Sequence, residues 1–142
     1  MGSGSNFQLP IRRRVIDTSV AAAIIFGDAA KELQEVEIDR RDFVAPSIIR
    51  YEFLNVCVKK HRSGLIDAER ALDAWREFEE LGIATEYVSF PESLALALRY
   101  RLSGYDATYL WFAVSQSLEL VTLETTLFLT YRKNPSFEKN QK

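Results

Sequence analysis

Short apolar runs alternate with longer amphipathic stretches along the chain. The apolar runs predict strands at 12–16, 42–45, 83–88 and 118–123. Between them, apolar residues recur at spacings of three and four, which predicts helices at 20–25, 29–38, 46–63, 67–81, 91–103, 106–118 and 124–131. Strands that alternate with helices predict an α/β fold, with a parallel sheet of about four or five strands and helices on both faces. The segment 135–137 is the candidate for a fifth strand.

Several residues mark where the predicted helices start and stop. Pro46 is placed at the first position of the helix that follows the second strand, where its missing N–H is tolerated. Pro91 opens a later helix, and Asp17 or Thr18 can cap the first one. Gly82 is expected to close the helix at 67–81.

The length of 142 residues corresponds to one domain with a single core. We expect residues 1–10 to be an unstructured lead or an expression remnant, and residues 11–142 to form that domain. The longest uninterrupted apolar stretch, 20–26, is far too short to cross a bilayer, so a cytoplasmic protein without a membrane partner is expected. A net charge of −2 excludes a globally basic nucleic-acid-binding protein. Cys57, as the single cysteine, cannot form an internal disulfide.

Four acidic residues occupy positions where such a chain is otherwise apolar: Asp17, Glu52, Asp106 and Glu124. A charge at such a position costs several kcal/mol unless it is paired or binds a cation. No equally well-placed set of basic residues accompanies them. Functional groups at the strand ends of a parallel sheet gather at its carboxyl edge, so all four can meet there. A shared divalent metal ion is the simplest explanation.

The composition narrows the choice of metal and of chemistry. One histidine and one cysteine cannot supply the usual zinc ligand sets. Oxygen ligands favour Mg²⁺ or Mn²⁺. A metal held by carboxylates can activate water and offset charge on a phosphoryl oxygen, which suits phosphodiester cleavage. Covalent acyl transfer fits poorly, because His61 lies in the polar run 59–62.

Four segments that contain these acidic residues resemble the signature blocks of PIN-domain nucleases. They are VIDTS at 15–19, YEFLNV at 51–56, YDATYL at 105–110 and LVTLE at 120–124. The blocks occur in family order and extend the resemblance from about residue 14 to residue 132. The chain is most similar in these blocks to the VapC-type toxins of prokaryotic toxin–antitoxin pairs.

The resemblance implies a three-layer PIN-like sandwich and one active site to which each block contributes residues. Asp17, Glu52 and Asp106 match the acidic residues of the family's magnesium site. Glu124 stands where the family most often has Asp, so its added methylene shifts the carboxylate or places a water before the metal. Two hydroxyls are expected to support the site: Ser19 and Thr122. The resemblance further implies an endoribonuclease whose products carry 5′-phosphate and 3′-hydroxyl ends, a homodimer, and inhibition by an antitoxin whose tail occupies the active-site groove.

Other interpretations stay open at this level. Asp17 and Asp106 could serve only as helix caps, and Lys59 and Arg99 are expected to contact RNA phosphates only if the acidic edge cleaves RNA. A PIN nuclease of RNA maturation shares the same chemistry, and a PIN-like module could bind RNA or a partner without cleaving it. A phosphotransferase with a nucleophilic aspartate is disfavoured, because Ser19 stands where such enzymes usually carry a second Asp.

Overall fold

Four short parallel strands form the centre of the fold. The computed structural model describes residues 13–27 and 42–133. Its strands are β1 (Arg14–Ile16), β2 (Phe43–Pro46), β3 (Ala84–Glu86) and β4 (Glu119–Val121), arranged in the order β3-β2-β1-β4. Arg14 lies beside Phe43 on one neighbouring strand and beside Glu119 on the other. The first described strand, β1, is therefore an inner strand of the sheet, paired on both sides.

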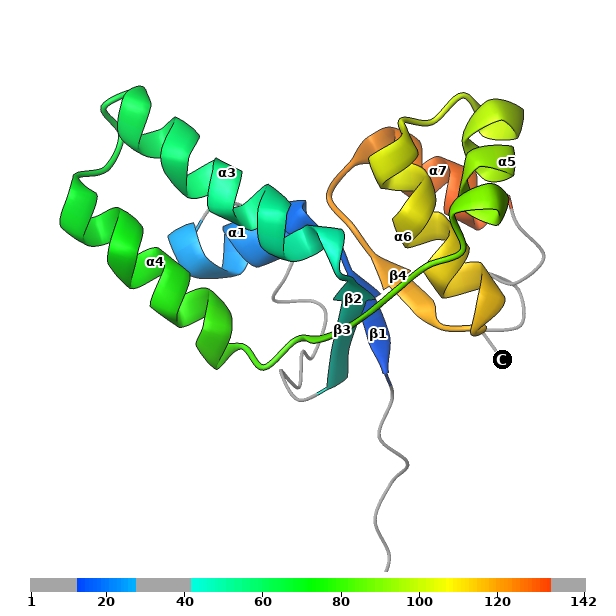
Figure 1. Cartoon of the computed structure of the whole chain (residues 1–142), viewed down its shortest axis with the longest axis horizontal. Coiled ribbons are helices and arrows are strands. Elements are labelled where there is room, and N and C mark those ends of the chain that lie inside the picture. The colour runs from blue at the N-terminus through cyan, green and yellow to red at the C-terminus, as the bar shows by residue number, and fades with distance from the viewer. Residues whose placement is uncertain (1–12, 28–41, 134–142) are drawn as a thin grey trace, which may run out of the picture.

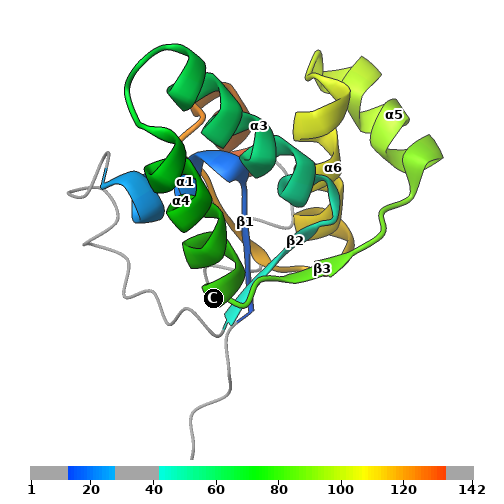
Figure 2. The same cartoon turned by 60° about the vertical axis from the view of Figure 1, so that its left-hand side comes forward.

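Six helices cover the two faces of the sheet within the described residues. One face carries α1 (Thr18–Phe26), α3 (Ile48–Arg62) and α4 (Ala68–Glu80), and the other carries α5 (Phe90–Tyr100), α6 (Gly104–Ser115) and α7 (Thr125–Arg132). Figures 1 and 2 show this separation from two directions. The predicted α/β fold, with a parallel sheet between two layers of helices, is confirmed.

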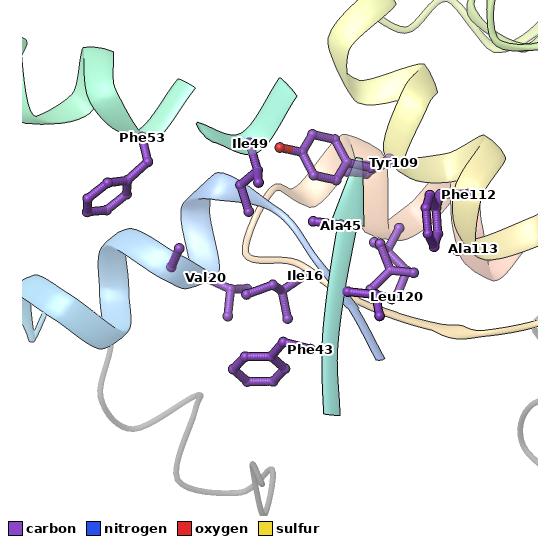
Figure 3. Packing of buried hydrophobic residues seen from close by; sticks show 14 of the residues in the cluster. Ile16, Val20, Phe43, Ala45, Ile49, Phe53, Tyr109, Phe112, Ala113 and Leu120 are labelled. Carbon is purple, nitrogen blue, oxygen red and sulfur yellow. The ribbon is translucent and has the colours of Figure 1, made fainter. Parts of the chain in front are cut away.

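The core fills the space between the sheet and both helical layers. In Figure 3, Ile16 and Val20 face Phe43 and Ile49, while Phe112 and Leu120 pack together on the far side of β2. Between α3 and α4, the rings of Phe53 and Phe78 stack with centroids 4.4 Å apart, and Trp75 stacks on Phe78 at 5.2 Å. Phe78 is buried, so the aromatic stripe of α4 serves core packing.

The structure corrects the predicted start of two helices. Pro46 is the last residue of β2 and pairs with Glu86, and α3 begins only at Ile48. A proline is tolerated at a strand end because one missing N–H there interrupts no further pairing. The predicted start of α6 at Asp106 is also wrong, because Ser103 caps the helix by accepting the Asp106 N–H at 3.0 Å. Asp106 therefore lies within the first turn.

One other predicted strand is longer than the observed one, and three predicted segments lie outside the residues that the structure describes. The third strand is confined to Ala84–Glu86. The predicted lead at 1–10, the helix at 29–38 and the possible strand at 135–137 lie outside the described residues. Among the described helices, none is both long enough and apolar enough to span a bilayer.

Candidate functional site

Four acidic side chains from four separate segments lie close enough for their charges to interact. Asp17 directly follows β1 and caps α1, and Glu124 precedes α7 shortly after β4. Glu52 lies in α3, and Asp106 lies in the first turn of α6. The charges of Glu124, Asp17 and Glu52 all act on Asp106, so the fold gathers residues from four separate segments.

Asp17 is the most buried of the four, with 4% of its surface exposed. Its Oδ1 accepts hydrogen bonds from Ser19 Oγ at 2.5 Å and from the Val20 N–H at 3.2 Å, while Oδ2 accepts from Thr122 Oγ1. Burial raises the pKa of Asp17 despite these three donors, and the charge of Glu124 contributes in the same direction. Asp17 is thus a helix cap and also a strongly desolvated carboxyl group.

The hydroxyls of Ser19 and Thr122 connect this carboxyl group to the end of β4. Ser19 Oγ accepts the Leu123 N–H at 3.1 Å, and Thr122 Oγ1 accepts the Glu124 N–H at 3.0 Å. Each hydroxyl therefore receives a hydrogen bond from the 122–124 segment and donates one to Asp17. This geometry fixes the position of the segment that carries Glu124.

Glu52 is half-buried and accepts two hydroxyl hydrogen bonds on the same oxygen. Its Oε1 receives Tyr109 Oη at 2.6 Å and Thr18 Oγ1 at 3.1 Å, and the two hydroxyl oxygens are 3.1 Å from each other. Burial raises the pKa of the Tyr109 phenol, and the charge of Glu52 raises it further. Tyr109 therefore stays protonated and acts as a donor.

Asp106 experiences the strongest crowding by like charges. Burial raises its pKa first, followed by the charges of Glu124, Asp17 and Glu52, while the Ser103 hydroxyl partly opposes the shift. Within residues 13–27 and 42–133, none of the four carboxylates forms an ion pair with Lys or Arg. No cation of the described residues neutralises the cluster by an ion pair, which is the electrostatic condition for binding a metal ion.

The side chains do not yet form a closed metal site. In the described part of the chain, no three Asp, Glu, His or Cys side chains are arranged to hold one metal ion as they stand. Glu52 directs one oxygen at hydroxyl groups, and Asp17 has donors on both oxygens. All available ligands are oxygen atoms, which matches the preference of Mg²⁺ and Mn²⁺.

A groove of about 430 Å³ opens beside Glu52 and includes Lys59 in its wall. Its rim carries the exposed rings of Tyr51 and Tyr105. Of the two cations expected to contact RNA, Lys59 therefore lines the same groove as Glu52. Arg99 lies on α5, with its guanidinium over the Tyr100 ring at 5.2 Å, and is not part of this groove.

The profile of the PIN domain family matches residues 14–133 of the chain. The chain belongs to the PIN domain family. It is 26% identical over 118 residues to Ribonuclease VapC3 of Pyrobaculum aerophilum, covering 80% of this chain and 90% of that protein. The fold superimposes on the crystal structure of PAE2754 from Pyrobaculum aerophilum with a TM-score of 0.69, at 24% identity and with 84% of each chain covered. The resemblance seen in the four sequence blocks is confirmed at the level of family and fold.

Sequence reasoning missed the hydroxyl pair on Glu52. Thr18 and Tyr109 both lie inside the sequence blocks, but the pattern predicts only a helix cap for Thr18 and no role for Tyr109. Tyr109 follows Asp106 by three residues, so both lie on the same side of α6. That spacing was the available signal, although it does not indicate which carboxylate the hydroxyl contacts.

Proposed function

We propose that this PIN-domain protein is a divalent-metal-dependent endoribonuclease, and that it is the toxin of a toxin–antitoxin pair. The observation that carries the nuclease proposal is the cluster of Asp17, Glu52, Asp106 and Glu124 without a cationic partner among the described residues. The similarity to Ribonuclease VapC3 supports RNA as the substrate.

The four carboxylates would hold Mg²⁺ or Mn²⁺, and small side-chain shifts would have to complete the ligand set, because no three of them surround one ion among the described residues. A bound divalent ion would supply an activated water and offset charge on the scissile phosphate. Ser19 and Thr122 keep Asp17 oriented, because each donates to one of its oxygens. Glu124 reaches the cluster from the start of α7, where it can bind the metal directly or through water.

RNA would enter along the groove beside Glu52. Lys59 in its wall would offset the repulsion between the phosphates and the acidic cluster. Tyr51 and Tyr105 expose 70% and 60% of their surfaces, so their rings are accessible to unpaired bases. This arrangement favours a single-stranded segment over a duplex, because bases within a helix are not free to stack on side chains.

Cleavage of a defined, end-labelled RNA with Mg²⁺, Mn²⁺ or a chelator tests the nuclease proposal. Asp17→Asn should lower the cleavage rate about 100-fold or more, because a metal ion contributes several kcal/mol to such reactions. Asp67→Asn is the matched control, since Asp67 also caps a helix, α4, but does not belong to the cluster. Undiminished metal-dependent cleavage by Asp17→Asn would refute the site.

The toxin assignment and the partners require separate experiments. Expression of the wild type, but not of Asp17→Asn, should arrest cell growth, and coexpression of the protein encoded by the adjacent reading frame should relieve the arrest. Cleavage without growth arrest, together with defective RNA processing on deletion, would instead indicate a nuclease of RNA maturation. RNA binding that persists in chelator with no cleavage in Mn²⁺ would indicate a non-cleaving module.

The proposed homodimer has one physical support. An apolar hollow of about 510 Å³ borders the groove beside Glu52, and its lining includes the exposed side chains of Tyr87, Phe90 and Leu94. The hollow and the groove share Tyr51 and Tyr105, so a second copy that covers the hollow would also contact these two rings. Apolar patches of this kind on soluble proteins commonly mark association surfaces. Sedimentation over a range of protein concentrations would measure whether the protein forms a dimer.

A further inference from the structure

A buried tyrosine reaches the acidic cluster from the core side of α6. Tyr109 is 1% exposed, and Figure 3 shows its hydroxyl pointing towards α3, the helix that carries Glu52. The ring packs in the same core as Phe112, which is also fully buried and has no polar atom to satisfy. A phenylalanine could therefore fill most of the space, so the hydroxyl of Tyr109 needs its own explanation.

The hydroxyl has an ionisable acceptor where a neutral one would suffice for folding. Buried phenol groups must find a hydrogen-bond partner, and a backbone carbonyl is adequate. Tyr131, equally buried at 1%, donates to the Leu118 carbonyl at 3.2 Å. Tyr109 instead donates to the Glu52 carboxylate at 2.6 Å, a length typical of a charge-assisted hydrogen bond.

Both hydroxyls near Glu52 contact the same carboxylate oxygen. Tyr109 and Thr18 donate to Oε1, and Oε2 accepts no hydrogen bond from the part of the chain that the structure describes. Two donors on one oxygen restrict rotation of the carboxylate. They also make the two oxygens different, because Oε1 accepts hydrogen bonds from the protein while Oε2 stays available for another partner.

We propose that Tyr109 and Thr18 are positioning residues that hold Glu52 by Oε1, so that Oε2 is the oxygen offered to a divalent cation. This inference rests on the proposed metal-dependent function and assigns the residues that prepare one of its ligands. Partners of this kind, which orient a metal ligand without touching the metal, typically change metal affinity by about 10–100-fold when they are removed. Without the hydroxyls, the Glu52 side chain would become ordered only when the metal binds, and the lost side-chain entropy would weaken metal binding.

The test is a titration of the full chain with Mn²⁺. The electron paramagnetic resonance signal of free Mn²⁺ measures how much of the ion stays unbound at each point. Tyr109→Phe should weaken Mn²⁺ binding by about 10-fold or more. Tyr131→Phe is the matched control, because it also removes one buried phenol hydroxyl but lies outside the cluster. Its Mn²⁺ affinity should equal that of the wild type.

Thr18→Val is the second variant and covers the case in which Tyr109→Phe does not fold. It removes the other hydroxyl from Glu52 Oε1 while keeping the side-chain shape, and it should also weaken Mn²⁺ binding. In cleavage assays, both variants should need more Mn²⁺ for half-maximal rate and recover much of the wild-type rate at saturation. A lower melting temperature with unchanged Mn²⁺ affinity in either folded variant would overturn the proposal, because it would show a purely structural role.

The same titration separates failure of this inference from failure of the proposed function. If the wild type binds Mn²⁺ and Asp17→Asn does not, the metal site stands, and equal affinity in Tyr109→Phe refutes only the positioning role. If the wild type binds no Mn²⁺, both proposals fall together.

Discussion

Replacing Asp17 with Asn should stabilise the metal-free protein while abolishing the proposed cleavage activity. Asp17 is buried, and its pKa is raised because burial outweighs its hydrogen bonds to Ser19, Thr122 and the Val20 N–H. The raised pKa already includes the effect of these favourable contacts. Folding therefore disfavours the ionised form of Asp17 relative to its ionised form in the unfolded chain. An amide has nearly the same shape, keeps an acceptor for Val20 and serves almost equally well as a helix cap. Its NH₂ group cannot accept the Thr122 hydroxyl as Oδ2 does, so that hydrogen bond must reverse and takes back part of the gain.

The sign of the pH dependence follows from the same shift. Below the unfolded-state pKa, Asp17 is protonated in both states and costs nothing. As the pH rises through the unfolded pKa towards the raised folded pKa, the wild type loses stability, and it stays less stable at higher pH. Asp17→Asn has no such loss, so its advantage should be present at neutral pH and should shrink as the pH falls towards about 4.

The expected gain at pH 7 is about 0.5–2 kcal/mol in the free energy of unfolding, the usual range for one stabilising substitution. For comparison, one pKa unit corresponds to about 1.4 kcal/mol. The gain should raise the melting temperature by about 2–6 °C for a domain of this size. Asp17 is also one of the charges that raise the pKa of Asp106, so its removal relieves a second carboxyl group.

Thermal unfolding in chelator and in Mn²⁺ provides the assay, with Asp67→Asn as the control for amide substitution at a helix cap. Mn²⁺ at 100 times its dissociation constant should stabilise the wild type by about 2.7 kcal/mol and should stabilise Asp17→Asn much less, so the order of stability reverses. An Asp17→Asn protein that is less stable than the wild type in chelator, by a margin that Mn²⁺ does not change, would refute the reasoning. Asp17 would then be chiefly a structural cap.

Two further substitutions test the edges of the site. Glu124→Gln should move the pKa of Asp106 back towards its ordinary value, because Glu124 contributes the largest charge effect on that group. A carbon-detected NMR titration of Asp106 would measure this change. An unchanged pKa of Asp106 would show that Glu124 does not belong to the cluster. Lys59→Ala, made in the Asp17→Asn background to prevent cleavage, should weaken RNA binding. The slope of the logarithm of the binding constant against the logarithm of the salt concentration should become shallower by about 0.7 for one lost phosphate contact. Arg99→Ala is its control, since Arg99 is not part of the groove, and an equal effect of both would point to non-specific attraction.

The sequence determined the layered fold and the chemical character of the site. The apolar periodicity of each segment is local information, and it placed every described strand and helix to within a few residues. The four acidic residues stood out because charge is costly at apolar positions, and Ser19 and Thr122 followed from the family resemblance. The errors occurred at boundaries: Pro46 could fit a strand end as well as a helix start, and Ser103 competed with Asp106 for the cap of α6.

Only the tertiary structure decided which groups contact one another. Thr122 donates to Asp17 across 105 positions of sequence, and Tyr109 donates to Glu52 across 57. These contacts exist because β1 pairs with β2 on one side and β4 on the other, which brings the ends of distant segments to one edge. Periodicity reports whether a residue is buried, but the hydrogen-bond partner of a buried hydroxyl depends on strand order and helix packing. The acidic residues could therefore be identified from the sequence, while the hydroxyls that hold Glu52 could not.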